Sequence, residues 1–126
     1  MKIESYRDLI VWQRSMELVV QTYDRIKAFP KNEEYGLTSQ IKRSAVSIPS
    51  NIAEGYGRRS SGDYIRFLQI SLGSLYELQT QVEISRRLSF LKDTDCIELD
   101  GLCEEVSKML VSLIDKISQH AKHNCA

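Results

Sequence analysis

The stretch SAVSIPSNIAEGYGRR, residues 44–59, has the apolar spacing of an α-helix, but it contains a proline and ends in glycines and arginines. Ala45, Ile48 and Ile52 recur at steps of three and four, which places them on one face of a helix. A proline inside a helix removes one backbone hydrogen bond and costs about 3 kcal/mol. Because the apolar pattern keeps its phase through Pro49, the stretch predicts one helix that is kinked at Pro49.

The same pattern extends upstream of this stretch. Leu37 and Ile41 continue the apolar stripe, and Asn32 is a residue type that caps helix N-termini well. The two glycines at the end of the stretch are expected to stop the helix. The sequence therefore predicts a helix over about residues 33–56.

Three further segments have helical periodicity, at about residues 6–29, 61–88 and 95–120. No alternating apolar and polar pattern competes with these helices, and their connections are short. Short connections favour antiparallel neighbours. We therefore expect residues 1–126 to form a single all-α domain, an up-down-up-down antiparallel four-helix bundle.

Local signals support three of these helix ends. Ser5 and Asp8 resemble a capping box at the start of the first helix, and Phe29-Pro30 ends that helix because the residue before proline avoids the helical region. Asp95 and Glu98 have capping-box spacing at the start of the fourth helix.

The third segment carries a second apolar stripe beside its main one, formed by Ile65, Leu72 and Tyr76. A helix with two apolar faces has more partners than one bundle core requires. These three residues are therefore predicted to lie at an interface between subunits of an oligomer.

The composition is that of an ordinary globular protein, with 17 basic and 17 acidic side chains and 27% charged residues. The charge is distributed unevenly, because residues 1–67 contain 11 basic and 8 acidic side chains and residues 68–126 contain 6 and 9. Three cysteines without the spacing of a disulfide framework indicate reduced thiols. No stretch reaches the roughly 18 apolar residues that cross a membrane, so we expect a cytoplasmic protein with no membrane partner.

A ladder of polar residues follows the predicted second helix at steps of three and four: Ser44, Ser47, Asn51 and Glu54, with Ser50 beside Asn51. One interpretation is a hydrogen-bonding seam between subunits, or the lining of a central channel. The other is that these side chains bond back to their own helix around Pro49, where a carbonyl loses its usual partner. The pattern alone leaves both interpretations open.

The junction between the second and third helices has the chain's best basic cluster with an aromatic residue: Lys42, Arg43, Tyr56, Arg58, Arg59 and Arg66. Arginines bind phosphates, and an aromatic ring can stack on an unpaired base. These residues are therefore candidates for binding nucleic acid. The alternative is a solvated loop whose arginines pair with Glu54, Asp63 or the acidic fourth helix.

Candidates for catalysis and metal binding are few. Both histidines lie in the C-terminal tail, so no catalytic triad is predicted. The tail motif His120-x-x-His123-x-Cys125 lacks a second ligand pair and is expected to fray rather than hold a metal. Glu-x-x-His motifs of di-metal bundles are absent, and Gly55-x-Gly57 follows a helix rather than a strand. We expect no cofactor, no metal and no enzymatic activity.

Several long motifs resemble one known family. They are YRDLIVWQR at residues 6–14, EYGLTSQIKR at 34–43, the opening stretch to Arg58, and FLQISLGSLYEL at 67–78. These motifs are similar to those of the four-helix bundle proteins encoded within bacterial 23S ribosomal RNA intervening sequences. The resemblance covers roughly the first two thirds of the chain.

This resemblance implies a four-helix bundle that assembles as a ring-like homopentamer. It also implies similarity to the accessory variability proteins of diversity-generating retroelements, which bind a reverse transcriptase and nucleic acid. No catalytic residue comes with the family. The leading hypothesis is therefore a non-enzymatic oligomer that binds structured RNA, or DNA, weakly. The alternative is a protein-interaction scaffold that recruits an enzyme such as a reverse transcriptase.

Overall fold

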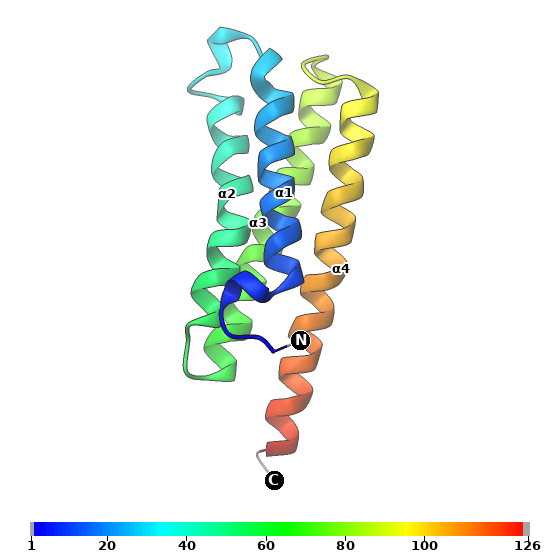
Figure 1. The fold of residues 1–126 in the computed structure, drawn as a ribbon. Helices are drawn as coiled ribbons and strands as arrows, with labels where there is room; N and C mark the ends of the chain where they lie inside the picture. The colour runs from blue at the N-terminus through cyan, green and yellow to red at the C-terminus, as the bar shows by residue number, and fades with distance from the viewer. Residues whose placement is uncertain (1, 125–126) are drawn as a thin grey trace.

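The computed structural model of the protein describes residues 2–124. Its four long helices are α1 (Ile10–Arg25), α2 (Leu37–Tyr56), α3 (Ser61–Arg87) and α4 (Asp93–Asn124). They run alternately up and down, and α1 and α3 each contact both α2 and α4 (Figure 1). The described residues contain no strand. The predicted all-α four-helix bundle is confirmed.

The connections between the helices lie at the two ends of the bundle. The α1–α2 and α3–α4 connections lie at one end, and the α2–α3 connection lies at the other (Figure 1). The last turns of α4 project beyond the other three helices (Figure 1). The candidate residues of the α2–α3 junction therefore lie a full helix length from the α1–α2 connection.

The core is built from the apolar stripes that the periodicity predicts. Large side chains from all four helices are almost completely buried: Leu18, Ile41, Ile48, Ile52, Leu68, Leu75, Leu78, Leu99 and Leu110. Cys96 and Cys103 are also buried, as free thiols, and burial raises the pKa of Cys103 to about 12. Burial of this apolar surface is the main term that stabilises the bundle.

The first predicted helix is interrupted near its start. The Ser5–Asp8 capping box is present, but it caps a short 3-10 turn, η1 (Tyr6–Asp8). Leu9 is then extended, and α1 begins only at Ile10. The break lets the Tyr6 ring pack edge-on against Trp12, with ring centroids 5.2 Å apart. At its other end α1 gives way at Arg25 to another 3-10 turn, η2 (Ile26–Ala28).

The second helix begins later than predicted, and Asn32 is not its cap. Asn32 lies within a 3-10 turn, η3 (Lys31–Glu33), and the backbone N–H of Leu37 donates instead to the Glu33 carboxylate at 3.1 Å. The helix then continues through Pro49, which is buried, and the kink itself stays a prediction. Gly55 does not stop the helix, which ends at Tyr56.

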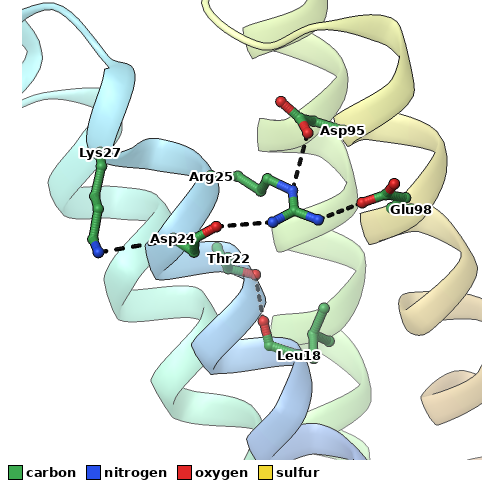
Figure 2. A network of polar contacts seen from close by, with 7 residues as sticks. All are labelled: Leu18, Thr22, Asp24, Arg25, Lys27, Asp95 and Glu98. Carbon is green, nitrogen blue, oxygen red and sulfur yellow. Dashed lines mark hydrogen bonds and ion pairs between the residues drawn. The ribbon is translucent and has the colours of Figure 1, made fainter.

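The predicted Asp95–Glu98 capping box is wrong, because both carboxylates turn away from the helix end toward Arg25 of α1. The Arg25 guanidinium lies 3.0 Å from Asp95 and 2.9 Å from Asp24, and it also pairs with Glu98 (Figure 2). The fourth helix starts at Asp93, two residues earlier than predicted, and it extends to Asn124. A second ion pair, between Arg14 and Glu105, also joins α1 to α4. Two arginines of the first half of the chain thus pair with three acidic residues of the fourth helix.

Candidate nucleic-acid interface

The junction between α2 and α3 is a tight turn. Gly57 follows the last residue of α2, and the hydroxyl of Ser60 accepts the backbone N–H of Asp63 at 3.1 Å to cap α3. The Arg58 N–H donates to the carbonyl of Gly55 at 3.0 Å. These bonds hold the residues between the two helices in a defined conformation.

Phe67 brings two arginines together at this junction. The Arg58 guanidinium lies 4.6 Å from the centre of the Phe67 ring, and the Arg66 guanidinium lies 5.6 Å from the same point. Both distances are within the range of a cation–π contact. Arg59 is exposed in the turn beside them. Arg58 and Arg66 therefore lie close together, and both guanidinium groups contact the ring of Phe67.

The arginines are partly neutralised by neighbouring carboxylates. Arg58 lies 3.3 Å from Glu54, and Arg66 lies 3.8 Å from Asp63. Both pairs are largely exposed, so each contributes little to stability. Within residues 2–124 Arg59 makes no ion pair, and the acidic residues of α4 pair with Arg14, Arg25 and Arg86 rather than with the junction.

The aromatic residue predicted to stack on a base is already engaged. The Tyr56 ring packs edge-on against Tyr64, with ring centroids 6.2 Å apart, and it is partly buried. Burial raises the pKa of Tyr64 to about 12, and the nearby Tyr56 adds to the shift. Tyr64 is therefore a neutral phenol at physiological pH. The junction offers guanidinium groups to a ligand more readily than aromatic faces.

Lys42 and Arg43 lie away from the other predicted binding residues. A helix rises about 1.5 Å per residue, so Lys42 is roughly 20 Å from Tyr56 along α2. The ammonium of Lys42 lies 5.3 Å from the centre of the Tyr23 ring on α1. The six predicted residues therefore do not form one cluster, because Lys42 and Arg43 lie near the start of α2 and the other four lie at its far end or beyond it.

The polar ladder of α2 is used largely within the bundle. Ser44 is 2% exposed, and its hydroxyl lies 2.7 Å from Oε1 of Gln81 on α3. The hydroxyls of Ser47 and Ser74 are 2.8 Å apart, and the Asn51 amide donates to the Ser47 carbonyl at 2.8 Å. These contacts form a hydrogen-bonded seam between α2 and α3 of one chain.

Back-bonding near Pro49 is also present. The Ser50 hydroxyl donates to the Val46 carbonyl at 2.8 Å. Val46 and Ser47 follow Ala45, whose carbonyl loses its usual partner because Pro49 has no N–H. The back-bonding interpretation thus describes part of the ladder, at the carbonyls that follow Ala45, whereas a role for the ladder between subunits or in a channel stays a prediction. Glu54 faces solvent and pairs with Arg58.

The α3 side of this seam was missed in the sequence. Ser71, Ser74, Gln81 and Ser85 recur at steps of three, seven and four, so they share a face as the ladder on α2 does. The Ser71 hydroxyl donates to the Ile48 carbonyl at 2.8 Å, next to Pro49. Matching the two polar patterns would have predicted this pairing.

The second apolar stripe of α3 has mixed exposure. Ile65 and Leu72 are partly buried, and Leu72 packs against the core of the same chain. Tyr76 is 50% exposed. Their place in a subunit interface stays a prediction.

No group of His, Cys, Asp and Glu among residues 2–124 has the arrangement of a metal site, and Cys125 of the tail motif lies outside the described residues. None of the described helices has the length and apolar character needed to cross a bilayer.

Comparison with known proteins places the chain in a family. A family model described as 23S rRNA-intervening sequence protein matches residues 7–112, which extends beyond the motifs quoted above into α4. A solved structure from Bacteroides thetaiotaomicron, described as a protein of unknown function from the S23 ribosomal protein family, is 27% identical. The two structures superpose with a TM-score of 0.78 over 83% of this chain and 98% of the other. No curated protein matches. Since the family model covers most of the chain, the protein belongs to the 23S rRNA-intervening sequence protein family.

Proposed function

We propose that this protein is a non-enzymatic, cytoplasmic oligomer that binds structured RNA weakly through the α2–α3 junction. One observation carries the proposal: Arg58 and Arg66 come from the two sides of the turn and meet on Phe67, with Arg59 exposed beside them. Three guanidinium groups in one place match the phosphates of a nucleic-acid backbone.

The charge balance of the junction argues for weak binding. Glu54 and Asp63 offset two of the three arginines. Strong binders make about 6–10 phosphate contacts, which is more than one junction offers. Repetition of the junction in an oligomer would raise the affinity for a polymer that touches several copies.

The engaged tyrosines favour recognition of the backbone over recognition of bases. Because the Tyr56 ring packs on Tyr64 and two arginines lie against Phe67, the aromatic surface left for an unpaired base is small. Phosphate contacts position a protein on a nucleic acid without reading its sequence. We therefore expect binding that depends on RNA shape and on salt concentration.

Self-association is supported by an apolar face on α1. Met16, Val20 and Tyr23 are spaced by four and three residues and are 38%, 64% and 37% exposed. Val46 of α2, 41% exposed, lines the same groove as Met16. Contiguous exposed apolar surface is typical of interaction sites. The resemblance to the pentameric family indicates a second copy of this chain as the partner.

A gel shift with fragments of ribosomal RNA tests RNA binding. The variant Arg58→Ala/Arg59→Ala is compared with wild type and with Arg86→Ala/Arg87→Ala, an adjacent arginine pair at the end of α3. Loss of two phosphate contacts should flatten the plot of log affinity against log salt by about 1.4–1.8. Equal, salt-insensitive behaviour of all three proteins would contradict the proposal.

Light scattering tests the oligomer. Wild type should have five times the mass of the chain, and Val20→Lys should reduce that mass because it places a charge on the α1 face. Ile97→Lys is the matched control, since Ile97 is 71% exposed on α4. A monomeric wild type would contradict the oligomer but leave the junction itself intact.

The α1 face also supports a second candidate function, a scaffold that recruits an enzyme such as a reverse transcriptase. In that case the junction arginines would only speed association. Size-exclusion chromatography of the protein mixed with a retroelement reverse transcriptase tests this candidate. Co-elution that Val20→Lys abolishes would support it, and separate elution would count against it.

A further inference from the structure

A cavity of about 320 Å³ lies where α1 gives way to α2, at the end of the bundle opposite the arginine junction. One wall is apolar and is formed by Tyr23, Ile26, Phe29 and Pro30. The Phe29 ring is held by Phe90, with ring centroids 5.6 Å apart. The size of the cavity is at the lower end of the range for small-molecule sites.

Three lysines from three separate elements line this cavity. Lys27 comes from η2, Lys31 from η3 and Lys42 from α2. The Lys27 ammonium lies 3.8 Å from the Asp24 carboxylate (Figure 2), whereas Lys31 makes no ion pair among the described residues. Lys42 lies over the Tyr23 ring. Glu34 is the one acidic side chain among the lining residues, so the cavity has a net positive charge.

Thr38, which also lines the cavity, has a buried hydroxyl without a hydrogen-bond partner among the described residues. Oγ1 of Thr38, in the first turn of α2, is shielded from solvent and makes no hydrogen bond within residues 2–124. A buried polar group without a partner is costly. Threonine in a helix adopts either of two χ1 rotamers, so this hydroxyl can turn into the cavity when an acceptor arrives. At the N-terminus of α2 the Leu37 N–H is already bound by the Glu33 carboxylate, so the positive charge at this place comes from the lysines.

We propose that this cavity binds a nucleotide. The phosphate monoester lies between Lys31 and Lys42 near the first turn of α2, and the planar base lies against the apolar wall. Two sources carry this chemistry: a free nucleotide, and the 5′-phosphorylated end of an RNA chain. The site is independent of the arginine junction, because the two lie at opposite ends of α2.

Calorimetric titration of the intact protein with adenosine 5′-monophosphate tests the proposal. We expect Lys31→Ala and Lys42→Ala each to weaken binding about tenfold. Lys92→Ala is the control, because Lys92 is an exposed lysine at the same end of the bundle that does not line the cavity. Glu34→Gln should tighten binding about twofold by removing the carboxylate. Adenosine and inorganic phosphate should each bind more weakly than the nucleotide.

A second measurement identifies the source and separates the cavity from the junction. An RNA oligomer with a 5′ phosphate is compared with the same oligomer bearing a 5′ hydroxyl. In the Arg58→Ala/Arg59→Ala background, which lacks two proposed RNA contacts of the junction, preference for the phosphorylated oligomer over the mononucleotide assigns the cavity to RNA ends, and the reverse assigns it to free nucleotides. Arg58→Ala/Arg59→Ala should bind adenosine 5′-monophosphate as wild type does. Failure of wild type to bind the nucleotide, or equal binding by Lys42→Ala and Lys92→Ala, would overturn the proposal.

Discussion

Gly55 of α2 packs directly against Phe67 of α3. A Cβ at residue 55 would lie 2.8 Å from the Cβ of Phe67 and 3.2 Å from the carbonyl oxygen of Tyr64. Backbone atoms on α3 cannot move away without shifting the whole helix. The glycine therefore sets how closely the two helices approach, and it places Phe67 where Arg58 and Arg66 meet.

Gly55→Ala should destabilise the protein by about 1–3 kcal/mol, the usual cost of overpacking. Gly73→Ala is the matched control, because a Cβ there meets no atom within 4 Å. That change should stabilise α3 by about 0.5–1 kcal/mol, since alanine is the better helix former. Urea unfolding of both variants measures the difference. Stabilisation by both changes would contradict the close approach at Gly55.

The hydrogen-bonded seam between α2 and α3 predicts outcomes of different size for two serines of α2. Ser44→Ala leaves the buried Gln81 amide oxygen without its partner and should cost about 1–2 kcal/mol. Ser50→Ala removes an exposed hydroxyl that bonds only to its own helix, and it should change stability by less than about 0.5 kcal/mol. Thermal unfolding compares the two variants. Similar, small effects would show that the seam adds nothing to the packing of α2 on α3.

The core and the helix count could be predicted because they depend on local periodicity. Leu68, Leu75 and Leu78 lie on one stripe in the sequence and are buried together in the bundle. Helix ends were harder, because distant residues compete for the capping groups. Asp95 has the spacing of a cap, but Arg25 of α1 binds it at 3.0 Å.

The arginine cluster could be predicted in part. Arg58 and Arg66 are close in sequence, and one turn brings them together. Lys42 was grouped with them because it lies on α2. The distance between two residues along a helix axis grows with the number of residues between them, so Lys42 lies far from the junction. Which face of α2 meets α3 is a tertiary property, so the pairing of Ser44 with Gln81 could not be read from α2 alone.

The end of α3 predicts a stabilising substitution. Ser89 has a φ of 62°, and the N–H groups of Ser89 and Phe90 donate to the carbonyls of Arg86 and Ser85. This is a Schellman motif, whose left-handed position favours glycine. Ser89→Gly should stabilise the protein by about 0.5–1 kcal/mol, because the left-handed region strains a residue with a Cβ. Chemical unfolding of wild type and Ser89→Gly measures this gain in stability.

The control for this prediction is the same substitution in a regular helix. Ser112 is exposed within α4, and Ser112→Gly should destabilise the protein by about 0.5 kcal/mol. Opposite signs at the two positions would show that backbone conformation decides the effect. Destabilisation at both would contradict the left-handed assignment of Ser89.

Asp100 predicts a pH-dependent gain in stability. Burial raises the pKa of Asp100 above its ordinary value of 3.8, and the charges of Glu83 and Glu104 add to the shift. When folding raises the pKa of an acid, the folded state keeps a proton at pH values where the unfolded state has released it. The acid therefore destabilises the folded state once the pH exceeds its pKa in the unfolded chain. Asp100→Asn should therefore raise stability at pH 7. The gain should shrink as the pH falls and disappear below about pH 3.8, where the carboxyl is protonated in both states.

Urea unfolding at pH 7, 5 and 3 measures the gain, with Asp115→Asn as the control on the exposed face of α4. A gain of the same size at all three pH values would show that the ionisation of Asp100 is not its cause.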